Sequence, residues 1–162
     1  MIVFDLDGCL IDSEEMIRKS YREAGAEPPG NFMSLGHHDW IEEDREAVHA
    51  RKDQFYLRGL RLGVPRREPW HTAEMLLAEG HEVTMLTSAP RGTVAVLEWH
   101  VSSWPFTEAY DGVGRAAKES WLAQRSVGVY VDDQEYVTIP EGWRFVHYTG
   151  QSAQKLYDEV TG

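Results

Sequence analysis

The sequence predicts an α/β protein with a doubly wound parallel sheet and a small helical insertion. Strand-like apolar runs alternate with helical patterns along most of the 162 residues, which is typical of parallel strands joined by right-handed crossovers. The first run, Ile2–Asp5, delivers the pair Asp5 and Asp7, and ligands of such sheets bind at the carboxyl ends of strands. About 60 residues, mostly helical, then precede the second run, far more than a crossover requires.

The predicted strands are short apolar runs bounded by turn-forming or helical segments. A weaker run surrounds Tyr110. The four clear runs are Ile2–Asp5, Val83–Thr87, Val127–Val131 and Phe145–Tyr148.

The longest predicted helices lie between the first two strands. The first begins near Asp12 or Ser13, either of which can cap it, and ends at Gly25. Residues 28–40 are expected to be irregular, and an amphipathic helix follows over Glu42–Leu60. Four shorter helices are predicted over Thr72–Glu79, Arg91–His100, Ala116–Gln124 and Ser152–Val160.

The surplus chain between the first two strands indicates a domain organisation. Pro65 and Pro69 are expected to interrupt the chain before the next helix. We therefore interpret residues 1–13 and 66–162 as the α/β core and residues 14–65 as a small helical cap, a lid beside the site. The alternative is that these helices simply cover the sheet.

Composition favours a small ligand over a polymer. The 16 basic and 27 acidic residues give a formal net charge of −11, a field that repels nucleic acids and anionic membranes. The single cysteine, Cys9, can form no intrachain disulfide, which fits a reducing compartment. There is no run of about 20 apolar residues, and a strand stands where a signal peptide would begin. We therefore expect a cytoplasmic protein without membrane contact, and no feature predicts its oligomeric state.

The end of the first strand carries the most informative chemistry. Asp5 and Asp7 lie two residues apart, so their side chains point the same way along the strand, and Gly8 permits a sharp turn. Two buried carboxylates are costly without a positive partner between them. A hard divalent cation and a phosphate are the usual partners.

Hydroxyl groups and backbone N–H groups follow the second strand. Thr87, Ser88 and Ala89 precede a proline and the next helix, an arrangement that binds phosphate. One of the two hydroxyls can instead cap that helix. Arg91, directly after them, is a candidate phosphate ligand or a solvated residue at the start of the helix.

A second acidic pair follows the fourth strand. Asp132 and Asp133 stand there, and Lys118 precedes the strand on a predicted helix. Because neighbouring parallel strands converge at their carboxyl ends, we expect Asp5, Asp7 and Asp132 or Asp133 to hold Mg²⁺. The Lys118 ammonium would hold phosphoryl oxygens together with a hydroxyl of the preceding segment. The alternatives are an exposed acidic turn and a solvated lysine.

This inventory predicts a magnesium-dependent phosphomonoesterase acting on a small phosphorylated substrate. With the charge neutralised, one carboxylate can attack phosphorus while the cation and the lysine stabilise the equatorial oxygens. The other carboxylate can protonate the leaving oxygen and then take a proton from water.

The four segments, in this order, resemble the motifs of the haloacid dehalogenase-like superfamily of phosphohydrolases. The resemblance covers nearly the whole chain and implies a Rossmann-like core, Mg²⁺ and an aspartyl-phosphate intermediate. Residues 14–65 occupy the position of the first cap type of that family, although they are few for such a cap. The matching segments are Asp5-Leu6-Asp7-Gly8, Thr87-Ser88, Lys118 and Asp132-Asp133.

The resemblance also implies roles for single residues. Asp5 would be the nucleophile and Asp7 the acid/base, with the backbone carbonyl of Asp7 also reaching the metal. Asp132 would be the metal ligand, and Asp133 a second ligand or an orienting group. Lys118 would balance the charge of the phosphoryl group.

A narrower resemblance concerns the substrate. Residues Thr87–Pro90, the second acidic pair and the aromatic stretch Trp143–Tyr148 are similar to the 5′(3′)-deoxyribonucleotidase branch. That branch implies a (deoxy)nucleoside monophosphate as the first substrate candidate. Four residues of the lid are candidates for contact with a base or sugar, or else for the core: Phe32, His37, His38 and Trp40.

Three other interpretations compete with the small-molecule phosphatase. A phosphatase acting on nucleic-acid 3′ ends suits a small cap but is opposed by the negative charge and the lack of a basic stripe. A non-catalytic, phosphate-binding regulatory module is opposed by the presence of every chemical group. Zinc binding by His37-His38-Asp39 is disfavoured because adjacent histidines cannot easily share one ion.

Overall fold

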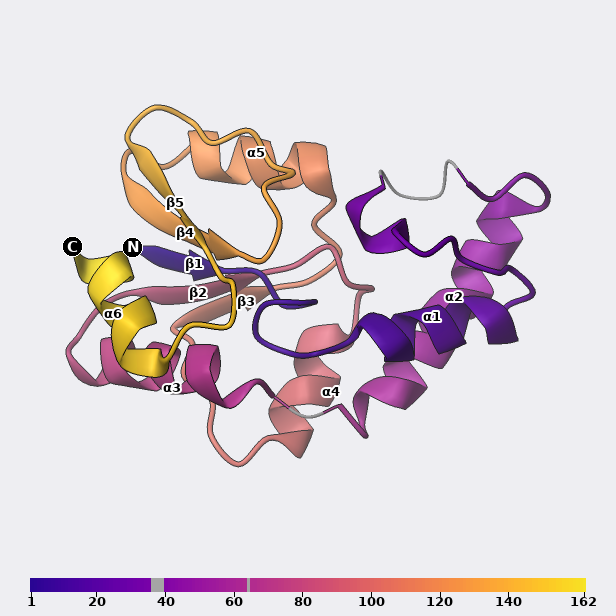
Figure 1. Cartoon of the computed structure of the whole chain (residues 1–162), viewed down its shortest axis with the longest axis horizontal. Helices are drawn as coiled ribbons and strands as arrows, with labels where there is room; N and C mark the ends of the chain where they lie inside the picture. The colour runs from indigo at the N-terminus through magenta and orange to yellow at the C-terminus, as the bar shows by residue number, and fades with distance from the viewer. Residues whose placement is uncertain (36–39, 64) are drawn as a thin grey trace.

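The computed structural model describes residues 1–35, 40–63 and 65–162 (Figure 1). Among these residues, five strands form one parallel sheet in the order β3-β2-β1-β4-β5. The order in which strands are added to the sheet reverses at β1, whose neighbours are β2 on one side and β4 on the other. Ligands of such sheets bind at this switch point. The strands are β1 (Ile2–Phe4), β2 (Val83–Leu86), β3 (Glu108–Tyr110), β4 (Gly128–Asp132) and β5 (Trp143–His147).

Helices cover both faces of the sheet (Figure 1). On one face, Leu122 of α5 (Arg115–Ala123) joins Val3 and Tyr130 in an apolar cluster. On the other face, Ile2 and Phe4 belong to the larger core. This alternation along β1 follows from the two-residue period of a strand that is buried on both sides. The second face is covered by α3 (Arg67–Ala78), α4 (Thr93–His100) and α6 (Ala153–Thr161).

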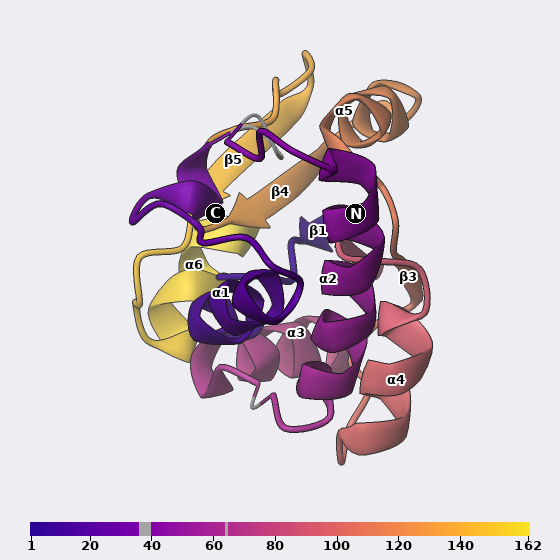
Figure 2. The ribbon, with the colours of Figure 1, turned by 90° about the vertical axis from the view of Figure 1, so that its right-hand side faces the viewer.

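Two helices lie apart from the three layers, beyond the carboxyl end of β1. α1 (Glu14–Glu23) and α2 (Arg45–Leu60) pack side by side and are joined through a 3₁₀ turn over Phe32–Ser34. Figure 2 shows both helices in front of the strand ends. We call residues 14–65 the α1–α2 insertion. Its buried side chains, Tyr21 and Tyr56 among them, belong to the same apolar cluster as Phe4 of the sheet.

The predicted α/β architecture is confirmed, and the differences lie at the ends of elements. α3 begins at Arg67 rather than Thr72, because Pro69 falls within its first turn, where the missing N–H has no helical partner to lose. α2 begins at Arg45, after Asp44 in a left-handed conformation with φ 47°. No helix in the described ranges has the length and apolar character that a membrane crossing requires.

Candidate active site

The chain turns sharply after β1 and presents two aspartates at the switch point. The N–H of Asp5 donates to the carbonyl of Val131 at 2.9 Å, which continues the ladder between β1 and β4. Gly8 then adopts φ +84°. A Cβ atom on Gly8 would stand 2.5 Å from a carboxylate oxygen of Asp133. Only glycine therefore provides both the turn and the room for that carboxylate.

Three carboxylates gather at the ends of β1 and β4. One ligand oxygen from each of Asp5, Asp132 and Asp133 lies within 4.8 Å of the others. Burial raises the pKa of Asp132 well above its ordinary value, and the Asp5 charge adds to this effect. Burial also raises the pKa of Asp133. Because their mutual repulsion is relieved by a hard cation with oxygen ligands, these residues fit a divalent metal ion.

A buried lysine neutralises part of this charge. Lys118 of α5 is completely buried, and its ammonium donates to Asp5 Oδ1 at 2.5 Å. It also donates to the hydroxyls of Tyr136 at 2.6 Å and Tyr130 at 3.3 Å. Burial alone would lower the pKa of Lys118, but the Asp5 carboxylate raises it above the ordinary value. The ammonium is therefore a permanent charge beneath the acidic cluster.

A side chain of the α1–α2 insertion donates a hydrogen bond to Asp7. The hydroxyl of Tyr56, on α2, donates to Asp7 Oδ1 at 2.9 Å. Burial raises the pKa of Asp7 to about 6, and the neighbouring Asp5 charge acts in the same direction. A carboxyl group with such a pKa exchanges protons near neutral pH. Asp7 is not part of the side-chain triad above, so its carboxylate remains available for proton transfer.

The segment after β2 contributes only part of the predicted phosphate site. Ser88 and Ala89 line the cavity described below. Thr87 is buried, and its hydroxyl accepts the N–H of Ala89 at 3.0 Å, so it shapes the turn instead. Arg91 is exposed and does not line the cavity, because its side chain lies over Gly112. The structure thus does not bring Arg91 to the acidic cluster.

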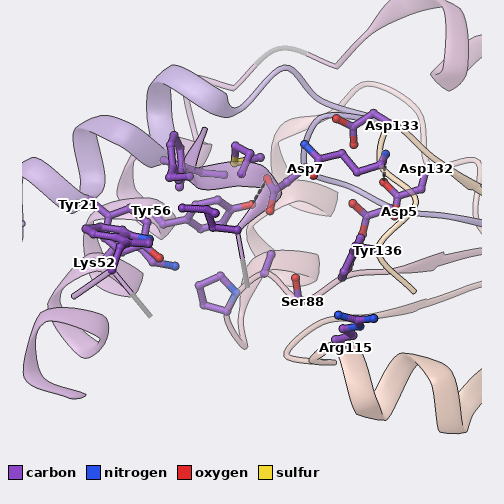
Figure 3. A pocket seen from close by; sticks show the side chains of 18 residues that line it. Asp5, Asp7, Tyr21, Lys52, Tyr56, Ser88, Arg115, Asp132, Asp133 and Tyr136 are labelled. Atoms are coloured by element: carbon purple, nitrogen blue, oxygen red, sulfur yellow. Dashed lines mark hydrogen bonds between the residues drawn. The ribbon is translucent and has the colours of Figure 1, made fainter. Parts of the chain in front are cut away.

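A cavity of about 200 Å³ joins the strand ends to the insertion. Figure 3 shows Asp5, Asp132 and Tyr136 on one side of it and Tyr21 and Lys52 on the other. The side formed by the insertion is lined by Ile17, Tyr21, Phe32, Met33, Leu35, Trp40, Lys52 and Tyr56.

The aromatic side chains of the insertion pack edge to face. Tyr21 meets Trp40 at a centroid distance of 4.8 Å and Phe32 at 6.0 Å. The nearly buried Lys52 has its ammonium 5.2 Å from the Tyr21 ring and 2.9 Å from Asp53 Oδ1. His37, His38 and Asp39 lie outside the described residues.

Several residues of the site were not predicted. Tyr130, whose hydroxyl contacts Lys118 and Asp132, lies two residues before Asp132, so strand alternation already placed both on one face. Lys52 and Tyr56 are four residues apart on a helix and share a face by the same kind of argument. Tyr136 and Arg115 carry no such signal, since one lies in a loop and the other at the first turn of α5.

Comparison with solved structures identifies the fold. A predicted phosphoglycolate phosphatase from Haemophilus somnus superposes with a TM-score of 0.60 at 18% identity, over 81% of this chain and 75% of that chain. A haloacid dehalogenase-like hydrolase from Streptococcus pneumoniae gives a TM-score of 0.60 at 16% identity, over 99% and 80%. The chain has the haloacid dehalogenase-like fold. The resemblance predicted from the four motifs is confirmed at this level.

A third structure with this fold contains a ligand. CbbY from Rhodobacter sphaeroides in complex with phosphate superposes with a TM-score of 0.59 at 13% identity, over 90% of this chain and 92% of that chain. No protein-family model and no curated protein sequence matches the chain. The nucleotidase branch is not specifically indicated by these neighbours.

Proposed function

We propose that the protein is a Mg²⁺-dependent phosphatase that hydrolyses a small phosphomonoester through an aspartyl-phosphate on Asp5. The observation that carries this proposal is the ion pair between Asp5 and the buried Lys118. Asp5 also belongs to the acidic triad, whose three members line the cavity. A carboxylate with its charge compensated can approach an anionic phosphoryl group, which an unpaired carboxylate would repel.

The two aspartates after β1 divide the chemistry. A carboxylate oxygen of Asp5 bonds to phosphorus as the bond from phosphorus to the leaving oxygen breaks, and protonated Asp7 gives its proton to that oxygen. Asp7 then takes a proton from water, whose oxygen attacks phosphorus, and the bond between phosphorus and Asp5 breaks. A pKa of about 6 suits Asp7 to both steps, because acid and base forms coexist near neutral pH.

The metal belongs to the same proposal. Asp5, Asp132 and Asp133 would hold Mg²⁺, with the backbone carbonyl of Asp7 as the further ligand that the family resemblance implies. When bound, the ion supplies positive charge next to the phosphoryl oxygens. Ser88 and the N–H groups that follow it would contact the same oxygens.

The leaving group would occupy the aromatic side of the cavity. Tyr21, Phe32 and Trp40 offer apolar faces and edges there, and Lys52 adds a cation with hydrogen-bond donors. A (deoxy)nucleoside monophosphate supplies a flat base for these rings and remains the first substrate candidate. The name of one structural neighbour adds phosphoglycolate as the second. Residues 14–65 would act as the cap that closes over either substrate and excludes water.

The test is release of inorganic phosphate from a panel of nucleoside monophosphates, sugar phosphates, phosphoglycolate and a 3′-phosphorylated oligonucleotide. Each is measured with Mg²⁺ and with a chelator. Turnover of one small substrate class that requires Mg²⁺, and that is lost in Asp5→Asn, is expected. Preference for the oligonucleotide, with a steep salt dependence, would instead indicate the nucleic-acid phosphatase.

A third result would point to the regulatory module. If the folded protein binds Mg²⁺ and phosphate but hydrolyses no member of the panel, catalysis on these substrate classes is rejected, which leaves a further substrate class or a binding role. The Asp5→Asn variant serves as the matched control here, because it retains the shape of the side chain and removes the nucleophilic charge.

A further inference from the structure

A second cavity, of about 550 Å³, shares no lining residue with the first. It lies where the end of α2 meets the start of α3 and the end of α4. Figure 2 shows the end of α2 between α3 and α4. Cavities of about 300 to 1,000 Å³ are the size that holds small molecules in proteins. The second cavity is therefore large enough for an organic ligand of its own.

Basic side chains surround the second cavity in a strongly acidic chain. Arg61 directly follows α2, and Arg67 is the first residue of α3. His71 and His100 also line the cavity, and Glu74 is the only carboxylate among its described lining residues. Neither arginine makes an ion pair or a side-chain hydrogen bond within the described part of the chain. The N–H donors of both guanidinium groups are therefore available to a ligand.

Glu74 does not compensate the two arginines, because its carboxylate already has other partners. One oxygen accepts a hydrogen bond from the hydroxyl of Ser103, and the other lies 3.1 Å from Nδ1 of His71. The bond from Ser103 is the main cause that holds the pKa of Glu74 below its ordinary value. The charge of the arginines thus has no partner in the cavity wall.

The floor of the second cavity is apolar and well packed. Trp70 and Leu97 line it and are almost fully buried. The Trp70 ring packs edge to face against Phe106 at a centroid distance of 5.3 Å, and its indole N–H donates to Ser103 at 3.2 Å. Because Trp70 follows Arg67 by three residues, both lie on the same face of α3. The cavity therefore joins an apolar surface to cationic donors.

We propose that the second cavity binds a small organic anion, whose phosphate or carboxylate group is held by Arg61 and Arg67 and whose apolar part lies on Trp70. The planar fork of a guanidinium group matches the oxygens of either kind of anion. This binding site goes beyond the proposed phosphatase function and does not depend on it.

The position of the site connects the two parts of the chain. Arg61 belongs to the α1–α2 insertion, and Arg67 lies beyond it on a helix that covers the sheet. A bound anion would contact both. Since Arg61 directly follows the helix that carries Tyr56, the ligand of Asp7, an occupied cavity would fix the end of that helix.

The test is calorimetric binding of phenyl phosphate and of benzoate to the metal-free protein. Both probes carry the same ring, so the tighter one identifies the anionic group that the site prefers. Without a cation the acidic triad repels both probes, and binding then reports the second cavity. We expect Arg61→Gln and Arg67→Gln each to raise the dissociation constant of the tighter probe about tenfold, as for loss of a bond to a charged group.

Arg58→Gln is the matched control. It removes the same charge from α2 one turn earlier, where the side chain lies over the Phe55 ring and does not line the second cavity. Its dissociation constant should stay within about threefold of that of the original protein. An equal weakening in this variant would overturn the proposal, because the effect would then come from the overall charge.

Two further results would overturn the proposal. One is the absence of binding for both probes at about 10 mM, which is weaker than any specific site of this kind requires. The other is unchanged binding in a folded Arg61→Gln/Arg67→Gln double variant, which would place the anion elsewhere. The phosphatase function is tested separately, because Arg67→Gln should retain the Mg²⁺-dependent phosphate release of the original protein when no other anion is added.

Discussion

Gly8 forms the turn after β1 and also makes room for a carboxylate of the proposed metal site. Its φ of +84° is unfavourable for any residue with a Cβ, and the atom that it lacks would stand 2.5 Å from the Asp133 carboxylate. Gly80 has the same φ of +84°, but nothing lies within 4 Å of the corresponding position. The two glycines therefore share the backbone conformation and differ in the contact.

This difference predicts the effects of two alanine variants. Gly8→Ala and Gly80→Ala should each lose about 1 kcal/mol of stability, the cost of a left-handed conformation. Gly8→Ala should in addition weaken Mg²⁺ binding by at least about tenfold, because Asp133 must move. Unfolding in denaturant and metal titration measure the two effects. Unchanged metal affinity in Gly8→Ala would contradict the assignment of Asp133.

Asp7 predicts a pH-dependent stability difference. Its folded pKa of about 6 lies above the unfolded value, so the folded protein resists the loss of this proton. Stability from this group is therefore full at low pH and falls as pH rises through about 6. Asp7→Asn should unfold with the same free energy as the original protein near pH 3, below the unfolded pKa, and with about 3 kcal/mol more above pH 7. Denaturant unfolding in chelator, over this pH range, measures the difference; a constant difference would contradict the raised pKa.

Helix α2 links the insertion to the acid/base group. Tyr56 donates to Asp7 from outside the sheet, so the position of α2 determines how Asp7 is oriented. The same helix face carries Lys52. In the proposed mechanism, one helix of the insertion would thus contact both the leaving group and the group that protonates it.

Tyr56→Phe is therefore expected to act on proton transfer. We expect kcat to fall about tenfold or more for an alkyl phosphate and much less for 4-nitrophenyl phosphate, whose leaving group needs no proton. Tyr157→Phe is the control, because Tyr157 lies on α6 and its hydroxyl bonds to Glu79 at the end of α3. A loss of equal size for both substrates would place the effect in a step that they share, such as hydrolysis of the aspartyl-phosphate, rather than in protonation of the leaving group.

The elements themselves were largely predictable because each has a local signal. Strands appeared as apolar runs and helices as amphipathic patterns, and errors arose where one residue type has two uses. Pro69 was interpreted as a break, yet proline is tolerated in the first turn of α3. Arg91 was considered either as a phosphate ligand or as a solvated residue at the helix start, and its side chain lies over Gly112. Which way an exposed arginine turns depends on tertiary neighbours that no local pattern encodes.

At the scale of the whole molecule, the predicted convergence of strand ends is confirmed. Asp5, Asp132 and Lys118, which lie far apart in sequence, meet at the switch point, because parallel strands bring their carboxyl ends together. Tyr56 and Tyr136 could not be predicted in the same way. Their positions depend on how an insertion and a loop pack onto the sheet, which has no periodic signature in the sequence.

The gathered carboxylates predict a stabilising effect of metal. At about 100 times its dissociation constant, Mg²⁺ should stabilise the fold by about 2.7 kcal/mol and raise the unfolding temperature by about 5 °C or more. The rise should be larger at pH 8 than at pH 5, because Asp132 and Asp133, whose pKa values are raised, must lose their protons to bind. Scanning calorimetry measures this effect, and Asp132→Asn should abolish most of it. An equal rise in that variant would place the ion elsewhere.

The apolar cluster that includes Phe4, Tyr21, Tyr56 and Leu60 determines whether the insertion can be removed or exchanged as a unit. A cap with a core of its own could be cut out or exchanged, and the sheet would keep its fold. Here buried side chains of the two insertion helices belong to the same apolar cluster as side chains of the sheet. Removing residues 14–65 would expose that apolar surface to water, at about 25 cal/mol for each Å². Exchange of this segment between proteins must therefore carry the facing side chains of the sheet with it.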